Sequence, residues 1–187
     1  NLLDHDFGQA LQAQAQEPLL ALEQVSVKFP IKQGLLNRIK EYVVAVEPLD
    51  LTLQAGVALG IVGESGSGKS SLALAIARLI ASEGKILFLG QDLNGYREKQ
   101  LRPLRSDLQI VFQDPFSSLN PRLSIGQIIA EGLEVQKIAA HEIEARVDQV
   151  LKEVELPIEF KLRYPHELSG GQRQRVSLAR ALVLQPK

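Results

Sequence analysis

An apolar run that leads directly into a glycine-rich loop and then into a helical pattern constrains the fold of this chain most. The run covers residues 57–62 and predicts a buried parallel strand, because such strands are apolar on both faces. The loop, residues 63–70, fits the pattern G-x-x-x-x-G-K-[ST]. Beyond it, Leu72, Ile76 and Ile80 recur at helical spacing and predict a helix over residues 69–80. Strands that alternate with helices predict an α/β domain.

The loop has the residue types that hold nucleotide phosphates. Glycines let the backbone wrap closely around a phosphate and direct its N–H groups inward, and the start of the following helix adds partial positive charge. Lys69 would reach the β- and γ-phosphates, and the Ser70 hydroxyl is placed to bind Mg²⁺. The candidate binding residues are Gly63, Glu64, Ser65, Gly66, Ser67, Gly68, Lys69, Ser70 and Ser71. This loop alone predicts phosphate binding and does not choose among kinases, GTPases and motor ATPases.

The remaining elements follow from periodicity and turn residues. Strands are predicted over residues 19–29, 43–46, 49–53, 85–89 and 109–112, with a turn at Gln54-Ala55-Gly56. Helices are predicted over residues 125–135, 141–154 and 172 to about 184. The basic insert over residues 30–42, which carries Lys32, Arg38 and Lys40, is interpreted as a solvated loop. The polar segment before Pro18 is interpreted as a linker.

Composition excludes several classes of protein. A formal net charge of -1 gives no electrostatic case for nucleic acid or an anionic membrane as the main partner. The chain has no cysteine for disulfides or thiolate metal sites, and no apolar run approaches the roughly 20 residues that span a bilayer. It also has no methionine, which, with the abrupt end at Gln185-Pro186-Lys187, leads us to expect a piece of a larger protein.

A second glycine motif, Leu168-Ser169-Gly170-Gly171-Gln172, precedes a helix that carries Arg173, Arg175 and Arg180. Ser169 is a typical N-cap residue, and the two glycines leave bare backbone N–H groups near a helix start. That arrangement could hold a second phosphate. Taken alone, however, a Ser-Gly-Gly sequence is more often an ordinary loop.

The two glycine motifs and Gln113 between them occur in the order and approximate spacing of ABC-transporter ATPases, and the chain resembles that family from Leu19 to Lys187. Residues 60–70 and 112–122 resemble the peptide-importer branch (oligopeptide/dipeptide, nickel). The leader resembles the joint before the second ATPase half of a fused importer protein. The resemblance implies a P-loop NTPase core with an N-terminal antiparallel β subdomain and an inserted α-helical subdomain at about 115–170. In it, residues 1–18 are a linker, and residues 19–187 are an ATPase domain that lacks the C-terminal part of its core.

The resemblance also implies roles for individual residues. Lys69 and Ser70 would bind phosphate and Mg²⁺, and Gln113 would be the Q-loop residue that touches Mg²⁺ and the attacking water. Ser169, Gly170, Gly171 and Gln172 would contact ATP held by a second ATPase domain packed head to tail. Either Phe29 or Tyr42 would stack on adenine, because the basic insert leaves the alignment ambiguous.

The implied protein is an ATP-hydrolysing importer subunit for peptides or related small solutes. Its partners would be the second ATPase domain, fused or separate, and transmembrane permease subunits at the cytoplasmic face of the membrane, with no direct nucleic-acid contact. Two alternatives stay open: a non-transport ABC ATPase, as in DNA repair or translation, and a half-site that holds nucleotide without hydrolysing it.

The chain departs from the family pattern at its end. The Walker B aspartate, the catalytic glutamate, the D-loop and the switch histidine would all follow a segment like residues 181–187, and none is present. Asp107 and Asp114 are not replacements, since neither ends an apolar strand after the signature helix, and His166 is interpreted as a surface loop residue. We therefore expect weak or no ATP binding and no turnover by residues 1–187, and marginal stability or aggregation because the phosphate-loop strand would lack a neighbour.

Overall fold

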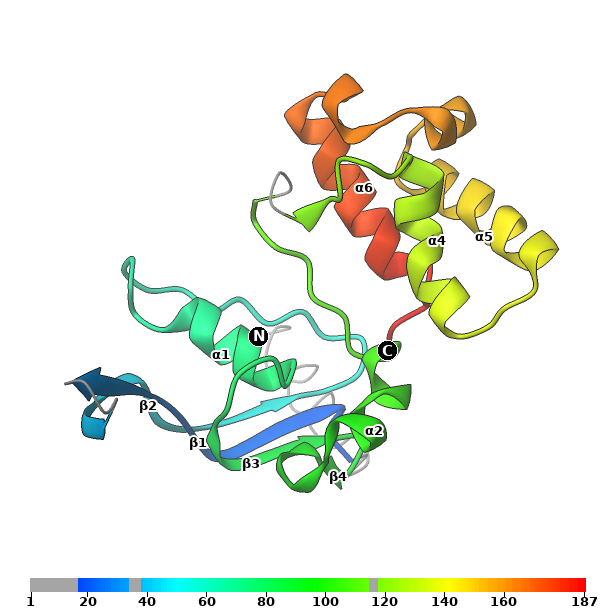
Figure 1. Cartoon of the computed structure of the whole chain (residues 1–187). Helices are drawn as coiled ribbons and strands as arrows, with labels where there is room; N and C mark the ends of the chain where they lie inside the picture. Colours follow the sequence, from blue (N-terminus) through cyan, green and yellow to red (C-terminus); the bar gives the residue numbers. More distant parts are fainter. Residues whose placement is uncertain (1–16, 34–37, 115–117) are drawn as a thin grey trace, which may run out of the picture. The chain divides into compact units, whose positions relative to one another are not determined.

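The computed structural model describes residues 17–33, 38–114 and 118–187. Most of the predicted linker (residues 1–16), the middle of the basic insert (34–37) and residues 115–117 lie outside the described residues. The chain divides into two compact units, Asn1–Tyr96 and Arg97–Lys187. Figure 1 shows the elements of each unit.

The first unit is built on a four-stranded antiparallel sheet. Its strands are β1 (Leu20–Gln33), β2 (Arg38–Leu53), β3 (Glu83–Phe88) and β4 (Gln91–Asp92), in the order β2-β1-β3-β4. A short helix, α1 (Lys69–Ile76), contacts β1 and β2 and covers one face of the sheet (Figure 1), and a 3₁₀ turn, η2 (Leu93–Gly95), follows β4. Val25 and Val27 of β1 and Ile86 of β3 are fully buried.

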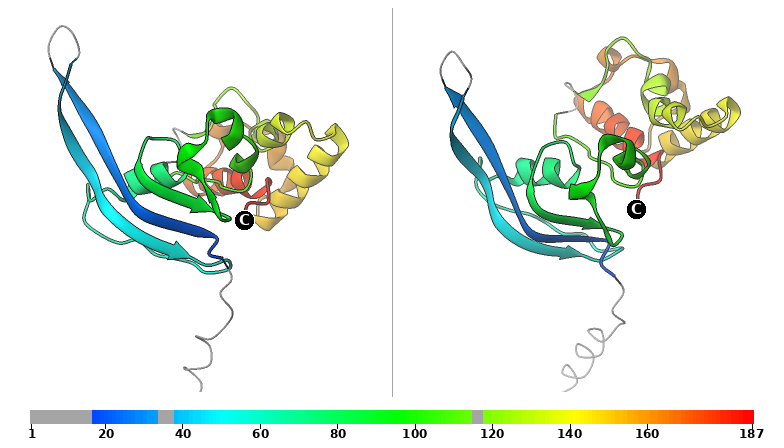
Figure 2. Two further views of the ribbon diagram at one scale, coloured as in Figure 1. Left: turned by 90° about the horizontal axis from the view of Figure 1, so that it is seen from below. Right: turned by 60° about the horizontal axis from the view of Figure 1, so that its bottom comes forward.

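The basic insert is not the solvated loop that we predicted. Pairing between β1 and β2 continues through Phe29↔Val43 and Ile31↔Glu41 as far as Gln33↔Arg38, so most of the insert is a long hairpin. In Figure 2 this hairpin extends well past the rest of the sheet of its unit. The prediction failed because a two-stranded ribbon whose described side chains are exposed needs no buried apolar face, so its composition does not distinguish it from a loop. Among the hairpin side chains that the structure describes, the exposed apolar ones are Phe29, Ile31, Tyr42, Val43 and Val44.

Two predicted strands do not form. Residues 57–62 and 109–112 belong to no strand, and Leu59, Ile61 and Val62 are 50%, 46% and 93% exposed. A strand requires hydrogen bonds to a neighbour, and within the described residues neither run is paired with another strand. The apolar pattern was therefore correctly recognised, but the pairing that converts it into a buried strand is missing.

The second unit is helical. Its main helices are α4 (Ile125–Val135), α5 (Ala140–Glu153) and α6 (Gly170–Leu182), and all three confirm the predicted helices to within two residues at each end. The shorter elements are α2 (Glu98–Leu101), η3 (Pro103–Arg105), η4 (Ile158–Leu162) and η5 (Pro165–Glu167). Helix α1, in contrast, ends four residues before the predicted helix over 69–80, because Arg78 adopts a left-handed conformation with φ 56°.

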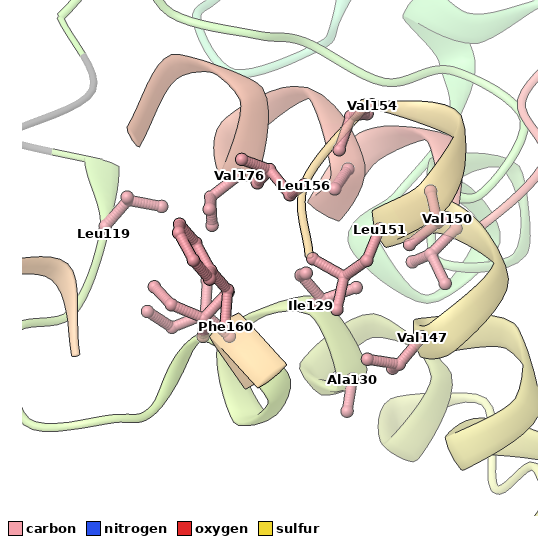
Figure 3. Packing of buried hydrophobic residues seen from close by; sticks show 14 of the residues in the cluster. Leu119, Ile129, Ala130, Val147, Val150, Leu151, Val154, Leu156, Phe160 and Val176 are labelled. Atoms are coloured by element: carbon pink, nitrogen blue, oxygen red, sulfur yellow. The ribbon is translucent and has the colours of Figure 1, made fainter. Parts of the chain in front are cut away.

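One apolar cluster holds the second unit together. It joins the inward faces of α4, α5 and α6 with Phe160 of η4, and Figure 3 shows Leu151 near Ile129 and Val176 near the ring of Phe160. Ile125, Ile129, Leu151 and Val176 are completely buried. Burying side chains of this size contributes about 1.5–3 kcal/mol each, so this cluster is the main stabilising feature of the unit.

Candidate nucleotide-binding site

The phosphate loop is organised around the ammonium group of Lys69. Its Nζ donates to the carbonyl oxygens of Gly63 at 2.9 Å and Glu64 at 2.5 Å, and lies 3.2 Å from Ser67 Oγ. A further bond, from Ser67 N–H to the Glu64 carbonyl at 3.2 Å, closes the turn. The loop therefore curls around a positive charge, which is the electrostatic requirement for an anionic ligand.

Gly68 fastens this loop to the sheet. Its φ is +87°, and a Cβ there would lie 2.1 Å from the carbonyl oxygen of Ala45 and 3.0 Å from Cγ2 of Val46. A side chain at this position would therefore be strained and would also strike the backbone of β2. The absence of a side chain sets how closely the loop approaches the strand.

Helix α1 begins directly after Gly68, so that Lys69, Ser70 and Ser71 form its first turn. Ser70 is exposed and Ser71 is half-buried. No acidic residue stands in this turn, so the partial positive charge of the helix start is not neutralised locally. This placement fits phosphate near the N–H groups and a metal near the Ser70 hydroxyl.

The residues fit a Mg²⁺ ion that is held chiefly by phosphate. Within the described ranges, no group of three His, Asp or Glu side chains converges on a point where a metal could bind. Mg²⁺ commonly keeps several waters and takes only one or two protein ligands beside substrate phosphates. A single serine hydroxyl next to a phosphate loop suits that mode of binding better than a protein cage.

The two adenine-stacking candidates lie on opposite faces of the hairpin. Val46 points at Gly68 and pairs with Val27, which identifies the face of the sheet that is turned toward the phosphate loop. Phe29 follows two residues after Val27 in β1 and lies on this same face, as does its cross-strand partner Val43. Phe29 is 43% exposed and is available to a ligand.

Tyr42 pairs with Pro30 and therefore lies on the other face, with Lys28. Lys28 Nζ is 2.7 Å from Glu83 Oε2, and this hydrogen bond and ion pair raise the pKa of Lys28. Smaller contributions from Glu47 and Tyr42 to the same pKa agree with a position of all three residues on that face.

The second glycine motif forms the start of α6 as a reciprocal cap. Ser169 Oγ accepts the N–H of Gln172 at 3.3 Å, and Gln172 Oε1 accepts the N–H of Ser169 at 2.9 Å. A Cβ added to Gly170 or Gly171 would meet nothing within 4 Å. A hollow of about 400 Å³ opens beside this turn, between α6 and the segment that contains Pro157. The helix start is thus rigidly capped and open in front of its glycines.

The arginines of α6 hydrogen-bond to backbone carbonyls of neighbouring segments, a structural role that sequence reasoning did not predict. Arg173 Nε donates to the Leu168 carbonyl at 2.9 Å, and Arg180 donates to the Ser118 carbonyl at 2.7 Å. Arg175 donates to the carbonyls of Val154 and Glu155 and forms an ion pair with Glu155 at 3.1 Å. Their donors satisfy carbonyls at the ends of neighbouring segments, and no spacing in the sequence identified those partners.

The other residues considered from the sequence are located as follows. Gln113 is exposed in a segment without regular secondary structure and belongs to the second unit, as do Ser169, Gly170, Gly171 and Gln172. His166 is exposed, as predicted, but it lies in the 3₁₀ turn η5 and not in a loop, and its ring stacks on Tyr164 with centroids 5.9 Å apart. The carbonyl of Asp107 accepts the N–H of Lys187 at 3.0 Å. The phosphate loop belongs to the first unit.

The sequence model of the family described as "ABC transporter" matches residues 46–187. That stretch includes the phosphate loop, Gln113 and the capped start of α6, and it covers most of the chain. The chain belongs to the ABC transporter family.

Relatives in this family are similar over nearly the whole chain. The peptidoglycan transport ATP-binding protein YejF of Agrobacterium fabrum is 50% identical over 183 residues, which is 96% of this chain and 34% of that protein. An uncharacterized ABC transporter ATP-binding protein YejF of Escherichia coli K12 is 53% identical over 90% of this chain and 32% of its own length. The glutathione import ATP-binding protein GsiA of E. coli K12 is 46% identical over 91% of the chain and 28% of its own length. The chain thus spans about a third of the length of these curated relatives.

Solved structures agree with the family and with the predicted fold class. The ATP-binding cassette MJ0796, in a dimeric post-hydrolysis state bound to ADP and Pi, is 31% identical with a TM-score of 0.76, over 89% of this chain and 70% of that one. CbiO1 of Clostridium perfringens, part of the ABC transporter complex cbiONQ, is 29% identical with a TM-score of 0.74, over 92% and 64% of the two chains. The α/β P-loop fold of an ABC ATPase cassette is therefore confirmed. None of the helices in the described ranges combines the length and hydropathy that crossing a bilayer requires.

Proposed function

We propose that this ABC-family chain is part of the ATP-binding and ATP-hydrolysing domain of an importer for peptides or related small solutes, and that hydrolysis requires the longer protein. The observation that carries the proposal is the phosphate loop, curled around Lys69 and fastened to β2 through Gly68. The names of the relatives, which refer to peptidoglycan transport and glutathione import, favour transport over a role in repair or translation.

In the proposed ATP site each residue has one task. Lys69 exchanges part of its bonding to the Gly63 and Glu64 carbonyls for the β- and γ-phosphates, and the first turn of α1 adds its N–H groups. The hydroxyl of Ser70 would hold Mg²⁺, which supplies charge neutralisation on the phosphates when bound. Gln113 would act as the Q-loop residue that touches Mg²⁺ and the attacking water.

Phe29 is the adenine-stacking residue in this proposal. It lies on the face of the hairpin that is turned toward the phosphate loop, whereas Tyr42 lies on the opposite face with Lys28. A base stacked on an aromatic ring is worth roughly 1–3 kcal/mol, so the face on which the ring lies decides which candidate can contribute.

The capped start of α6 serves a different nucleotide. Ser169, Gly170, Gly171 and Gln172 would contact the γ-phosphate of ATP held by a second ATPase domain, packed head to tail. The open space in front of Gly170 and Gly171 supports a partner's ligand at this turn. Permease subunits at the cytoplasmic face of the membrane would complete the importer.

Uptake by cells tests this function. Bacteria whose only copy of the full-length protein carries Lys69→Ala should fail to accumulate a labelled tripeptide, glutathione or muropeptide that wild-type cells take up. Tyr42→Ala is the control and should retain uptake, because that side chain lies away from the phosphate loop. Uptake that persists undiminished in Lys69→Ala cells would contradict the proposal.

A further inference from the structure

Helix α6 holds the chain shortly after Gln113. Arg180 donates to the Ser118 carbonyl at 2.7 Å, and Ser177 Oγ lies 3.3 Å from Ser118 Oγ. Ser177 and Arg180 are three residues apart and therefore share one face of the helix. The residue after Ser118, Leu119, is buried in the apolar cluster of the same unit. Ser118 is thus fixed to α6 through both its main chain and its side chain.

Arg180 also borders the chain that precedes Gln113. It lines a hollow of about 380 Å³ together with Ile110 and Phe112. Phe112 is the residue directly before Gln113, and Ser118 follows so soon that the chain from Gln113 to Ser118 spans at most about 18 Å. One side chain of α6 therefore lies next to the chain on both sides of Gln113.

We propose that Arg180 is a positioning residue that holds the segment carrying Gln113 in a fixed place relative to α6. The assignment rests on the proposed function, in which Gln113 touches Mg²⁺ and the attacking water. The start of α6, about 15 Å along the helix from Arg180, carries the glycines that would contact the partner's nucleotide. Because α6 is one capped element of 13 residues, a shift of its start passes through Arg180 to Gln113.

Arg146 of α5 offers a matched control. It is half-buried, as Arg180 is, and its guanidinium donates to the Glu142 carboxylate at 2.6 Å. Arg146→Ala and Arg180→Ala remove the same group from the same unit, but only Arg180→Ala releases the Ser118 carbonyl. A loss of activity that follows from lower stability of the helical unit would therefore appear in both variants.

Steady-state ATP hydrolysis by the full-length protein tests the assignment, with the turnover that Lys69→Ala removes taken as the contribution of this domain. Arg180→Ala should lower the kcat of that turnover about tenfold and leave the KM for ATP within about twofold, because it displaces a group that acts in the chemical step. Arg146→Ala should leave both constants unchanged. Arg180→Lys should restore most of the kcat, since an ammonium can donate to the same single carbonyl.

A double-mutant cycle separates the positioning of Gln113 from a structural role. Gln113→Ala should lower kcat by itself, and Arg180→Ala should then lower it by less than about twofold more. Losses that multiply in the double variant, or an Arg180→Lys variant as impaired as Arg180→Ala, overturn the role of Arg180 and leave the ATP site standing. Turnover that does not depend on Lys69 overturns the proposed function and the role of Arg180 with it.

Ser177→Ala keeps the test decisive if Arg180→Ala does not fold. It removes the other contact to Ser118 with little change in volume. It should lower kcat about threefold, and only while Gln113 is present. An unchanged kcat, or an equal loss in the Gln113→Ala background, overturns the proposal that α6 positions Gln113 through Ser118.

Discussion

The two glycine segments of this chain look alike in sequence and are held in different ways. Both precede a helix whose first turn lacks an acidic residue. The phosphate loop is fixed from within, by Lys69 on its own carbonyls and by Gly68 against the Ala45 carbonyl. The start of α6 is fixed by a side-chain cap, and the space before Gly170 and Gly171 is open.

A comparison with helix α4 shows that a reciprocal serine–glutamine cap does not by itself leave open space in front of a helix start. It begins with the same reciprocal cap, between Ser124 and Gln127, yet a Cβ on Gly126 would lie 3.1 Å from the Lys161 carbonyl. The same reciprocal cap therefore has neighbouring atoms in front of it in α4 and open space in front of it in α6. This difference supports our proposal that the phosphate loop binds the nucleotide of this chain, whereas the N–H groups at the start of α6 contact a nucleotide bound by a partner.

The largest expected difference between the two glycine segments is in the loss of stability when a glycine is replaced by alanine. Gly68→Ala combines a left-handed backbone with a clash against β2 and should destabilise the first unit by about 3 kcal/mol or more. Gly66→Ala, at φ +83° with nothing within 4 Å, isolates the strain and should cost about 1–2 kcal/mol. Gly171→Ala should not destabilise the chain. Thermal unfolding followed by circular dichroism measures the stability of all three variants. Equal losses of stability in Gly68→Ala and Gly171→Ala would contradict the conclusion that the two segments are held in different ways.

The next effect concerns the hairpin. Phe29→Ala should weaken ATP binding about tenfold through lost stacking, whereas Tyr42→Ala should leave the affinity unchanged. Nucleotide titrations of the two variants against wild type provide the measurement. A greater loss at Tyr42 would place the adenine on the other face of the sheet and reverse the assignment.

The smallest effect concerns the caps. Ser169→Ala and Ser124→Ala should each cost about 1 kcal/mol, and Ser169→Asn should restore the stability, because asparagine is an equally good N-cap. Hydrogen exchange of the first-turn amides of α6 and α4 reports the loss locally. If Ser169→Ala also lowered the affinity of this chain for ATP, the two segments would share one ligand.

The helices and the phosphate loop could be predicted from sequence because their determinants are local. The 3.6-residue pattern of α5, the cap residues Ser124 and Ser169, and the spacing of Gly63, Gly68 and Lys69 all act within a few residues. In contrast, residues 57–62 have the composition of a buried strand but form none, since pairing depends on a neighbour remote in sequence. The hairpin and the carbonyl partners of Arg173 and Arg175 depend on tertiary contacts in the same way.

The most direct test is an NMR titration with MgATP, which measures even the weak binding expected of residues 1–187, of the chain in three forms: wild type, Lys69→Ala and Gly171→Asp. Lys69→Ala should weaken binding by at least about tenfold, because it removes the charged donor at the centre of the loop. Gly171→Asp places a negative charge at the start of α6, where helices tolerate it, and should change the affinity by less than about twofold. The claim is that the first glycine segment binds the ATP of this chain and that the second contacts a partner's nucleotide. Equal losses of affinity in the two variants, or an affinity that does not depend on Lys69, would contradict it.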